Sequence, residues 1–319
     1  MIKFKYYEEK YFYDIEELIL NSYKYDFPIW GLSRHEFSKG LHPDFKNCHK
    51  VWTESMGLYF ESEKLVASVL SEGSYDGDAF FFFDSKERSK DKALLERMVR
   101  FSITHLAKVE DNRTTNTLYL TVPDWHIELK DVLTKYGFTL NESKENVNIL
   151  HFDNLPYEVS LKPEFHFAKD YVKPFYLSNA HRQSFNYGYP TTELGSTAFE
   201  NLRTMKHYDS ELEVVILDSE ERPVGFAIGW ANEKMPYAEL EPMAVVWWCR
   251  RQGLATALIH ELSNRVRRKY PNIYGITGGD QPFYYALGFK NVASLPVYVF
   301  KKDIYISWDS RSLHEDYSF

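Results

Sequence analysis

The chain reads Arg250-Arg251-Gln252-Gly253-Leu254-Ala255 at the point where an apolar stretch gives way to an amphipathic one. The apolar stretch, 237–246, has the composition of a buried strand. After the hexapeptide, aliphatic residues recur every four positions, which predicts one buried face of a helix: Leu254, Leu258, Leu262 and Val266. The hexapeptide is therefore expected to be the turn between a central strand and a long helix.

This turn has the features of an anion-binding site. The first N–H groups of a helix lack backbone partners, and the helix dipole adds partial positive charge there. Gly253 has no side chain to block those groups, and Arg250 and Arg251 add full charges beside them. The pattern indicates a site for a pyrophosphate or another multiply charged anion. Alone, it fits equally well an ordinary helix start that contains a glycine and exposed arginines.

A second motif follows in Gln281-Pro282-Phe283-Tyr284-Tyr285-Ala286-Leu287-Gly288-Phe289. Its spacing predicts a short helix with Gly288 as the C-cap, and Phe289 then begins the next strand. Taken alone, this motif favours a capped helix with aromatic packing over any chemical role.

The elements expected around the two motifs form an α/β pattern that occurs twice. In the second half we expect helices at 168–183, 196–205, 254–266 and 281–287, and strands at 212–217, 224–230, 237–246, 272–277 and 289–300. In the first half we expect helices at 14–23, 92–107 and 127–136, and strands at 56–61, 64–70, 79–83, 117–122 and 138–152. The short helix of the first half also closes on a Gly-Phe pair, Gly137-Phe138.

Repetition at this length predicts two domains of one architecture rather than a solenoid. The polar segment 153–158, which contains a proline, is the natural boundary between them. We therefore expect a first domain at 1–153, a second at 157–303 and a C-terminal tail at 304–319.

In this order and spacing, the two motifs resemble those of the GCN5-related N-acetyltransferase (GNAT) superfamily. Arg250, Gly253 and Ala255 match the family pattern Gln/Arg-x-x-Gly-x-Gly/Ala. The later motif, an aromatic-Tyr pair followed by Leu-Gly-Phe, matches 283–289. Trp247 departs from the proline of many members, in the turn rather than at the anion contacts. The resemblance is close over 160–302 and holds only in outline for the first half. It implies two tandem GNAT-like domains, each a mixed, mostly antiparallel sheet flanked by helices.

The resemblance also implies that acetyl-CoA is the cosubstrate and that no metal takes part. Its pyrophosphate would lie on the backbone of the hexapeptide, and its pantetheine arm between two splayed strands. The residues assigned to cofactor binding in this way are Met243, Ala244, Val245, Arg250, Arg251, Gln252, Gly253, Leu254, Ala255, Thr256 and Phe283. The acceptor would be an amine, on a small molecule or a peptide, that attacks the thioester directly.

Two proton transfers accompany such a reaction. The resemblance implies that Tyr284 protonates the departing sulfur, and a phenol pKa of about 10 suits that role. The amine must lose a proton, and Glu239 or Glu241 is expected to accept it through water, because strand alternation places both on the same side. The sequence does not choose between the two carboxylates. Either carboxylate could equally be a solvated residue at the strand edge, without a role in proton transfer.

The first half lacks both chemical elements. It has no glycine between Gly77 and Gly137, and the entry to its long helix, 84–91, contains carboxylates that would obstruct an anion. Four residues before Gly137, where the second half has Tyr284, stands Leu133, which has no proton to donate. The first half is therefore expected to be a degenerate, non-catalytic GNAT-like domain.

Composition limits the partners and the setting. The formal net charge of -8 disfavours nucleic acid as the main partner. Cys48 and Cys249 provide neither a disulfide framework nor a structural zinc site. The N-terminus has no secretory pattern and the apolar runs are too short to span a membrane, so we expect a cytoplasmic protein without a membrane partner.

Two other functions remain open at this point. One is a CoA-binding regulatory module that performs no turnover. The other is an acyltransferase of the tandem mycothiol-synthase type, which has a larger acceptor. Fold and cofactor motifs do not encode the acceptor, and the oligomeric state is also open.

Overall fold

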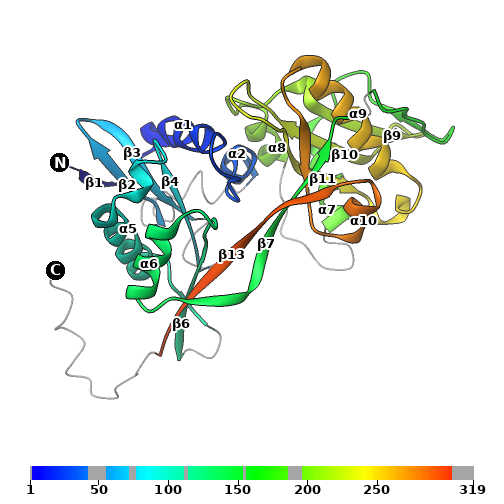
Figure 1. The fold of residues 1–319 in the computed structure, drawn as a ribbon. Helices are drawn as coiled ribbons and strands as arrows, with labels where there is room; N and C mark the ends of the chain where they lie inside the picture. Colours follow the sequence, from blue (N-terminus) through cyan, green and yellow to red (C-terminus); the bar gives the residue numbers. More distant parts are fainter. Residues whose placement is uncertain are drawn as a thin grey trace.

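The computed structural model describes residues 2–41, 55–71, 77–110, 114–153, 156–185 and 196–303. Figure 1 shows that these residues form two lobes, one from each half of the chain, joined by two long neighbouring strands. The expected tail at 304–319 lies outside the described residues.

The first half contains four α-helices among its described residues and a run of strands. In chain order its elements are β1 (Lys3–Tyr6), η1 (Glu9–Tyr11), α1 (Phe12–Ser22), α2 (Leu32–Leu41), β2 (Gly57–Glu61), β3 (Lys64–Leu70), β4 (Asp78–Phe83), η2 (Arg88–Lys90), α5 (Lys92–His105), β5 (Lys108–Val109), β6 (Thr115–Thr121), α6 (Ile127–Lys135) and β7 (Thr139–His151). Strands β2 and β3 form a hairpin that turns at Ser62 and Glu63. Both residues have positive φ, as a tight two-residue turn requires.

The second half repeats the order of elements that the sequence predicts. Its elements are β8 (Phe165–Phe167), α7 (Pro174–Phe185), α8 (Ser196–Leu202), η3 (Ser210–Leu212), β9 (Glu213–Asp218), β10 (Pro223–Trp230), β11 (Glu239–Val245), η4 (Trp247–Cys249), α9 (Leu254–Lys269), β12 (Gly275–Gly278), α10 (Pro282–Ala286) and β13 (Lys290–Asp303). Helix α7 begins six residues later than the spacing predicts, with Pro174 as its first residue, a position that suits the missing proline N–H.

The strands form two sheets. One has nine strands in the order β1-β2-β3-β4-β6-β13-β7-β12, with β5 beside β6, and the other has the order β11-β10-β9-β8. Almost all the pairs are antiparallel, while β4 and β6 run parallel. Helices lie against these sheets in both lobes (Figure 1). The predicted fold class, a mixed and mostly antiparallel α/β arrangement in two tandem halves, is confirmed.

The two halves exchange their last strands. From the first half, β7 pairs with β12 of the second, and from the second half, β13 pairs with β6 of the first. The two exchanged strands also pair with each other over much of their length, and Figure 1 shows them side by side between the lobes. Leu150 of β7 is buried in the hydrophobic core of the second half. The proposed boundary at 153–157 therefore divides the chain but not the sheet.

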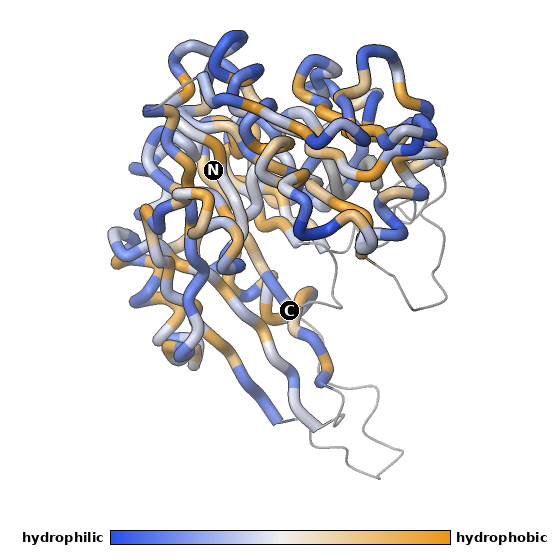
Figure 2. Tube along the Cα trace, turned by 90° about the vertical axis from the view of Figure 1, so that its right-hand side faces the viewer, coloured by the Kyte–Doolittle hydropathy of each residue, from blue (hydrophilic) through white to orange (hydrophobic). Residues whose placement is uncertain are grey.

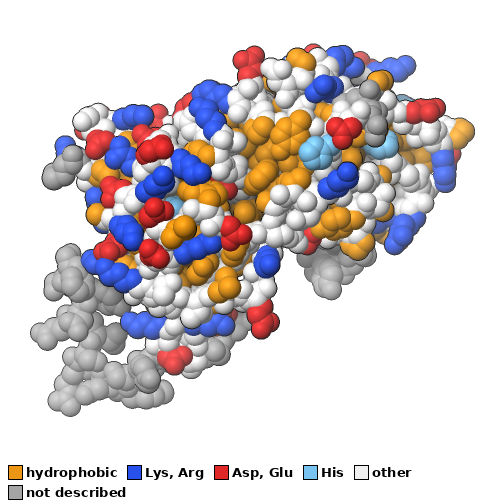
Figure 3. Space-filling model, in the orientation of Figure 1, with side chains coloured by type: hydrophobic (Ala, Val, Ile, Leu, Met, Phe, Trp, Pro, Cys, Tyr) orange, Lys and Arg blue, Asp and Glu red, His pale blue; other side chains and the backbone are white. Residues whose placement is uncertain are grey.

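The outer surface carries mixed charge. On the face drawn in Figure 3, Lys and Arg side chains are interspersed with Asp and Glu, and hydrophobic side chains gather near the middle of the view. Figure 2 shows that many turns at the outside of the molecule are hydrophilic, whereas hydrophobic residues recur along the strands. No helix among the described residues is long and apolar enough to cross a membrane.

The strand exchange predicts how a cut chain behaves. If the chain is expressed as two pieces, 1–153 and 156–319, the pieces should co-purify as a one-to-one complex, because each supplies a strand to the other's sheet. The second piece alone should fail to melt cooperatively, since β12 then loses its neighbour β7. Affinity purification with a tag on either piece, followed by thermal melting, checks this. Two independently folded monomers would contradict it.

Candidate active site

The hexapeptide forms a loop whose backbone N–H groups face outward at the start of α9. Arg251 and Gly253 both have positive φ, 63° and 83°, so the chain turns sharply twice before the helix. The bond from Ala257 N–H to Gly253 O, at 3.0 Å, is the first of the helical pattern, so the N–H groups of Leu254, Ala255 and Thr256 precede it. A Cβ built on Gly253 would meet nothing within 4 Å. The backbone N–H groups at the start of α9 therefore lie beside open space.

Arg250 has a different role from the one its charge suggests. Its Nε donates to Val245 O at 3.2 Å and its Nη2 donates to Ser184 O at 2.5 Å. The guanidinium therefore ties the end of α7 to the end of β11. The Arg251 side chain is exposed, while Gln252 accepts a hydrogen bond from Lys162 at 3.0 Å.

Strands β11 and β12 touch at one point and then separate. They meet at an isolated parallel bridge between Ala238 and Ile276. Beyond it, β11 is the edge of its own sheet and pairs only with β10 among the described strands. Its register against β10 shifts between Ala227 and Gly229, which marks a bulge in the pairing. The edge of β11 is therefore open to an extended ligand, which can pair with it as an added strand.

A cavity of about 760 Å³ occupies the space between the open strand edge, the α9 start and α10. This volume is in the range of small-molecule and cofactor sites. The lining residues are Ser184, Phe185, Met243, Ala244, Val245, Cys249, Arg250, Arg251, Gly253, Leu254, Ala255, Thr256, Gln281, Pro282, Phe283 and Ala286.

The structure brings together every residue assigned to cofactor binding except Gln252, which points toward Lys162 instead. The end of α7 also contributes Ser184 and Phe185 to the cavity lining, because the fold brings α7 against β11. Cys249 also lines the cavity; it is buried, and its burial raises the pKa of the thiol.

Tyr284 lies behind Phe283, next to the cavity wall. A Cβ at Gly278 would lie 2.5 Å from its ring, and one at Gly279 would lie 2.9 Å away, so two glycines make room for the phenol. Burial raises the pKa of Tyr284, the charge of Glu241 adds to this, and a hydrogen bond from the Gly279 backbone opposes it. The phenol is therefore protonated at neutral pH and has a proton to donate.

The structure separates the two candidate bases. Glu239 is 6% exposed and accepts hydrogen bonds from the Tyr23 hydroxyl and, at 2.7 Å, from Ser33 N–H. It lies against the start of α2 in the first half, where Gly31 leaves room for it. Burial raises the pKa of Glu239. A bulge between Leu240 and Met243 interrupts the alternation of β11, and the two carboxylates have different surroundings.

We therefore reassign Glu239 to the contact between the halves. Glu241 is half-buried, and its charge helps to raise the pKa of Tyr284, so it is the carboxylate of the pair that lies near that phenol.

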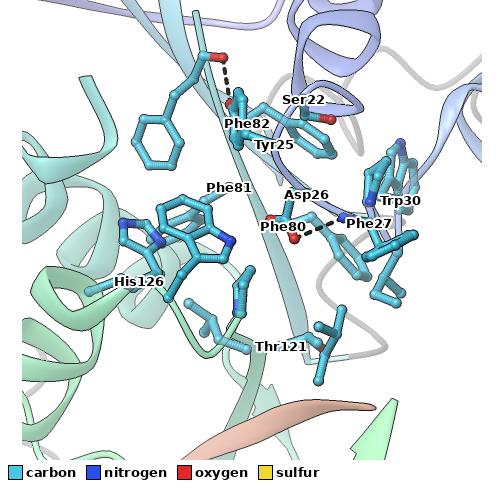
Figure 4. A pocket seen from close by; sticks show the side chains of 18 of the residues that line it. Ser22, Tyr25, Asp26, Phe27, Trp30, Phe80, Phe81, Phe82, Thr121 and His126 are labelled. Atoms are coloured by element: carbon cyan, nitrogen blue, oxygen red, sulfur yellow. Dashed lines mark hydrogen bonds between the residues drawn. The ribbon is translucent and has the colours of Figure 1, made fainter. Parts of the chain in front are cut away.

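The equivalent helix start in the first half is closed. Asp91 is the N-cap of α5, and its carboxylate accepts hydrogen bonds from Ala93 and Leu94 N–H, both at 3.1 Å. The donors that an anion would need are therefore already used. A nearby cavity between α1 and β4, shown in Figure 4, has a volume of about 60 Å³, which holds only a few waters. Its half-buried Asp26 accepts from Phe27 N–H at 2.8 Å.

One group of side chains among the described residues could be considered for a metal: Glu16, Glu36 and His207, whose donor atoms lie within 4.8 Å of one another. The side-chain oxygen of Asn232 accepts a hydrogen bond from Lys234 N–H. Asn232 Nδ2 therefore faces His207 Nδ1, and the two nitrogens are 3.4 Å apart. His207 Nε2 lies 3.3 Å from Glu16 Oε2. Burial raises the pKa of Glu36, so the group fits a proton shared between carboxylates.

An open strand edge that leads to an open helix start is a geometry that suits an extended ligand ending in an anion. Residues 210–291 match the family described as acetyltransferase (GNAT) domain. This match identifies a GNAT domain within the second half of the chain.

Two solved structures are similar along nearly the whole chain. A tandem GNAT protein from the clavulanic acid biosynthesis pathway has a TM-score of 0.57 at 11% identity, covering 94% of this chain and 98% of that one. A GCN5-related N-acetyltransferase from Sphaerobacter thermophilus has a TM-score of 0.54 at 13% identity, covering 95% of each chain. At this identity the likeness shows the fold. No curated protein matches the sequence.

Proposed function

We propose that the chain is an acetyl-CoA-dependent N-acetyltransferase with one active site, in the second half, that acts directly on a primary amine of a small molecule or peptide. One observation carries the proposal. A single cavity joins the open N–H groups of Leu254, Ala255 and Thr256 to Phe283, the neighbour of a protonated Tyr284. Its shape and donors fit a long ligand with a pyrophosphate at one end and a reactive group at the other.

The residues divide the work as follows. Acetyl-CoA, when bound, supplies an acetyl group activated as a thioester. The N–H groups at the α9 start hold the pyrophosphate, and the free edge of β11 at Met243, Ala244 and Val245 aligns the pantetheine amides. Tyr284 holds a proton at Oη for the departing sulfur, and Glu241 accepts the amine's proton through water.

The enzyme is distinguished from a binding module by thiol release. Purified protein with acetyl-CoA and pooled primary amines should release free CoA thiol in proportion to time and enzyme, and only when an amine is present. Binding of acetyl-CoA without thiol release from any amine would favour a regulatory module. Release only with large conjugated acceptors would favour a mycothiol-synthase-like reaction.

The assignment of the base to Glu241 predicts a difference between two matched variants. Glu241→Gln should remove the acidic limb of the pH dependence of kcat and lower kcat by about 10²-fold, the usual scale for a lost general base. Glu239→Gln should leave the shape of that profile unchanged and lower the melting temperature, because a buried carboxylate loses hydrogen bonds to the first half. The reverse pattern would return the role to Glu239.

A further inference from the structure

Asn148, on the exchanged strand β7, lies at the seam between the first half and the candidate active site. It is 1% exposed and pairs in register with Gly278 of β12 on one side and Asn291 of β13 on the other. It is thus a first-half residue held inside the sheet of the second half.

The Asn148 amide uses all of its hydrogen-bonding positions. Its Nδ2 donates to Gly279 O and to Asp280 Oδ1, both at 3.1 Å. Its Oδ1 accepts from Asn291 Nδ2 at 3.4 Å and shares the single proton of the Tyr285 hydroxyl, at 3.2 Å, with Asp280. Because Gly279 O can only accept, the orientation of the amide is fixed. A buried amide with every position satisfied is a rigid support.

What this amide supports is the loop that borders Tyr284. Gly278 and Gly279 lie against the ring of Tyr284. Asp280 is held a second time by Asn146 of the same strand, at 3.1 Å, and by the Tyr285 hydroxyl. Asn148 therefore contacts the residue that contacts the phenol, and it also holds the neighbouring tyrosine on α10.

We propose that Asn148 is a positioning residue through which the first half fixes Tyr284 for catalysis. The inference rests on the proposed function of Tyr284. It gives the degenerate half a definite part in the active site: the half contributes no reacting group, but its last strand places the loop against which the proton donor lies.

The test uses the full-length protein and an isosteric change. Asn148→Asp keeps the size of the side chain but cannot donate, so a carboxylate faces Gly279 O and Asp280. We expect kcat to fall by about 10- to 100-fold, the scale of a misplaced reacting group, with the affinity for acetyl-CoA within threefold of wild type, since the cavity lining is untouched. The alkaline limb of the pH dependence of kcat should also move, which a purely structural role would not cause.

Two further variants test the same proposal. Adding Asp280→Asn to Asn148→Asp restores a donor opposite the new carboxylate, while Gly279 O still faces an acceptor, so kcat should recover in part. Asn141→Asp, on the same strand but bonded locally to Ser143 and Glu142, is the matched control and should behave as wild type.

Hydrogen exchange followed by mass spectrometry measures how well the loop is ordered, and this measurement requires no turnover. Amides of 279–289 should exchange at least about tenfold faster in Asn148→Asp, while those of α9 keep their wild-type rates. Unchanged exchange in 279–289 overturns the proposal, as does faster exchange with an unaltered kcat. Absence of amine-dependent thiol release in the wild type would instead defeat the proposed function, and the exchange result would still decide whether Asn148 orders the loop.

Discussion

Gly253→Asp is expected to abolish acetyl-CoA binding, with the apparent Kd rising by at least about 10²-fold. The substitution directs a carboxylate into the open space beside the α9 N–H groups, where the pyrophosphate is proposed to lie. Like charges brought together in this way cost several kcal/mol, and each 1.4 kcal/mol is about a factor of ten in affinity. Isothermal titration calorimetry measures the loss directly.

A matched control separates charge from backbone strain. Gly137 closes the short helix of the first half with φ 85°, close to the 83° of Gly253, and a Cβ there also meets nothing within 4 Å. Gly137→Asp therefore carries the same left-handed strain, about 1–2 kcal/mol, far from the cavity. It should lower the melting temperature and leave acetyl-CoA affinity unchanged. Equal loss of binding in both variants, or undiminished binding by Gly253→Asp, would remove the anion-site assignment.

Tyr284→Phe is expected to lower kcat by about 10²-fold or more with little change in acetyl-CoA affinity, because it removes the proton donor and leaves the cavity wall in place. Burial raises the pKa of Tyr284, so in the wild type the phenol stays protonated through neutral pH, and activity should fall only as pH rises through that raised pKa. The variant should lose this alkaline limb. Steady-state kinetics across pH provides the measurement.

Tyr274→Phe is a suitable control for the tyrosine change. Tyr274 also lies in the second half, is partly buried and does not line the cavity, so loss of its hydroxyl should leave kcat unaltered. A wild-type kcat in Tyr284→Phe would show that the thiolate leaves unaided or that another group protonates it.

Much of this architecture could be predicted from local sequence signals. The four-residue spacing after Gly253 predicts α9, and the Ser62-Glu63 turn between two apolar runs predicts the β2–β3 hairpin; both are confirmed. Most of the residues assigned to cofactor binding follow one another along 243–256, so a single strand–turn–helix places them together; Phe283 joins them from α10, and Gln252 points away.

The pairing of strands that are far apart in the chain could not be predicted from local sequence signals. The exchange of β7 and β13 depends on which strand edges meet, and no periodicity within either strand distinguishes its own half from the other. Glu239 illustrates the consequence. Strand alternation placed it beside Glu241, whereas its partners Tyr23 and Ser33 are more than two hundred residues away in the chain and a bulge breaks the alternation.

The central claim is that one site transfers acetyl directly from acetyl-CoA to an amine. Single-turnover mass spectrometry with ¹³C-acetyl-CoA tests it most directly, with the protein in excess and a pool of primary amines present. The account predicts that the label appears on an amine, that Gly253→Asp and Tyr284→Phe suppress its transfer, and that no residue of the protein, Cys249 included, carries it at any time. Label that accumulates on the protein, or acetyl-CoA that stays bound and unreacted with every amine, would contradict the account.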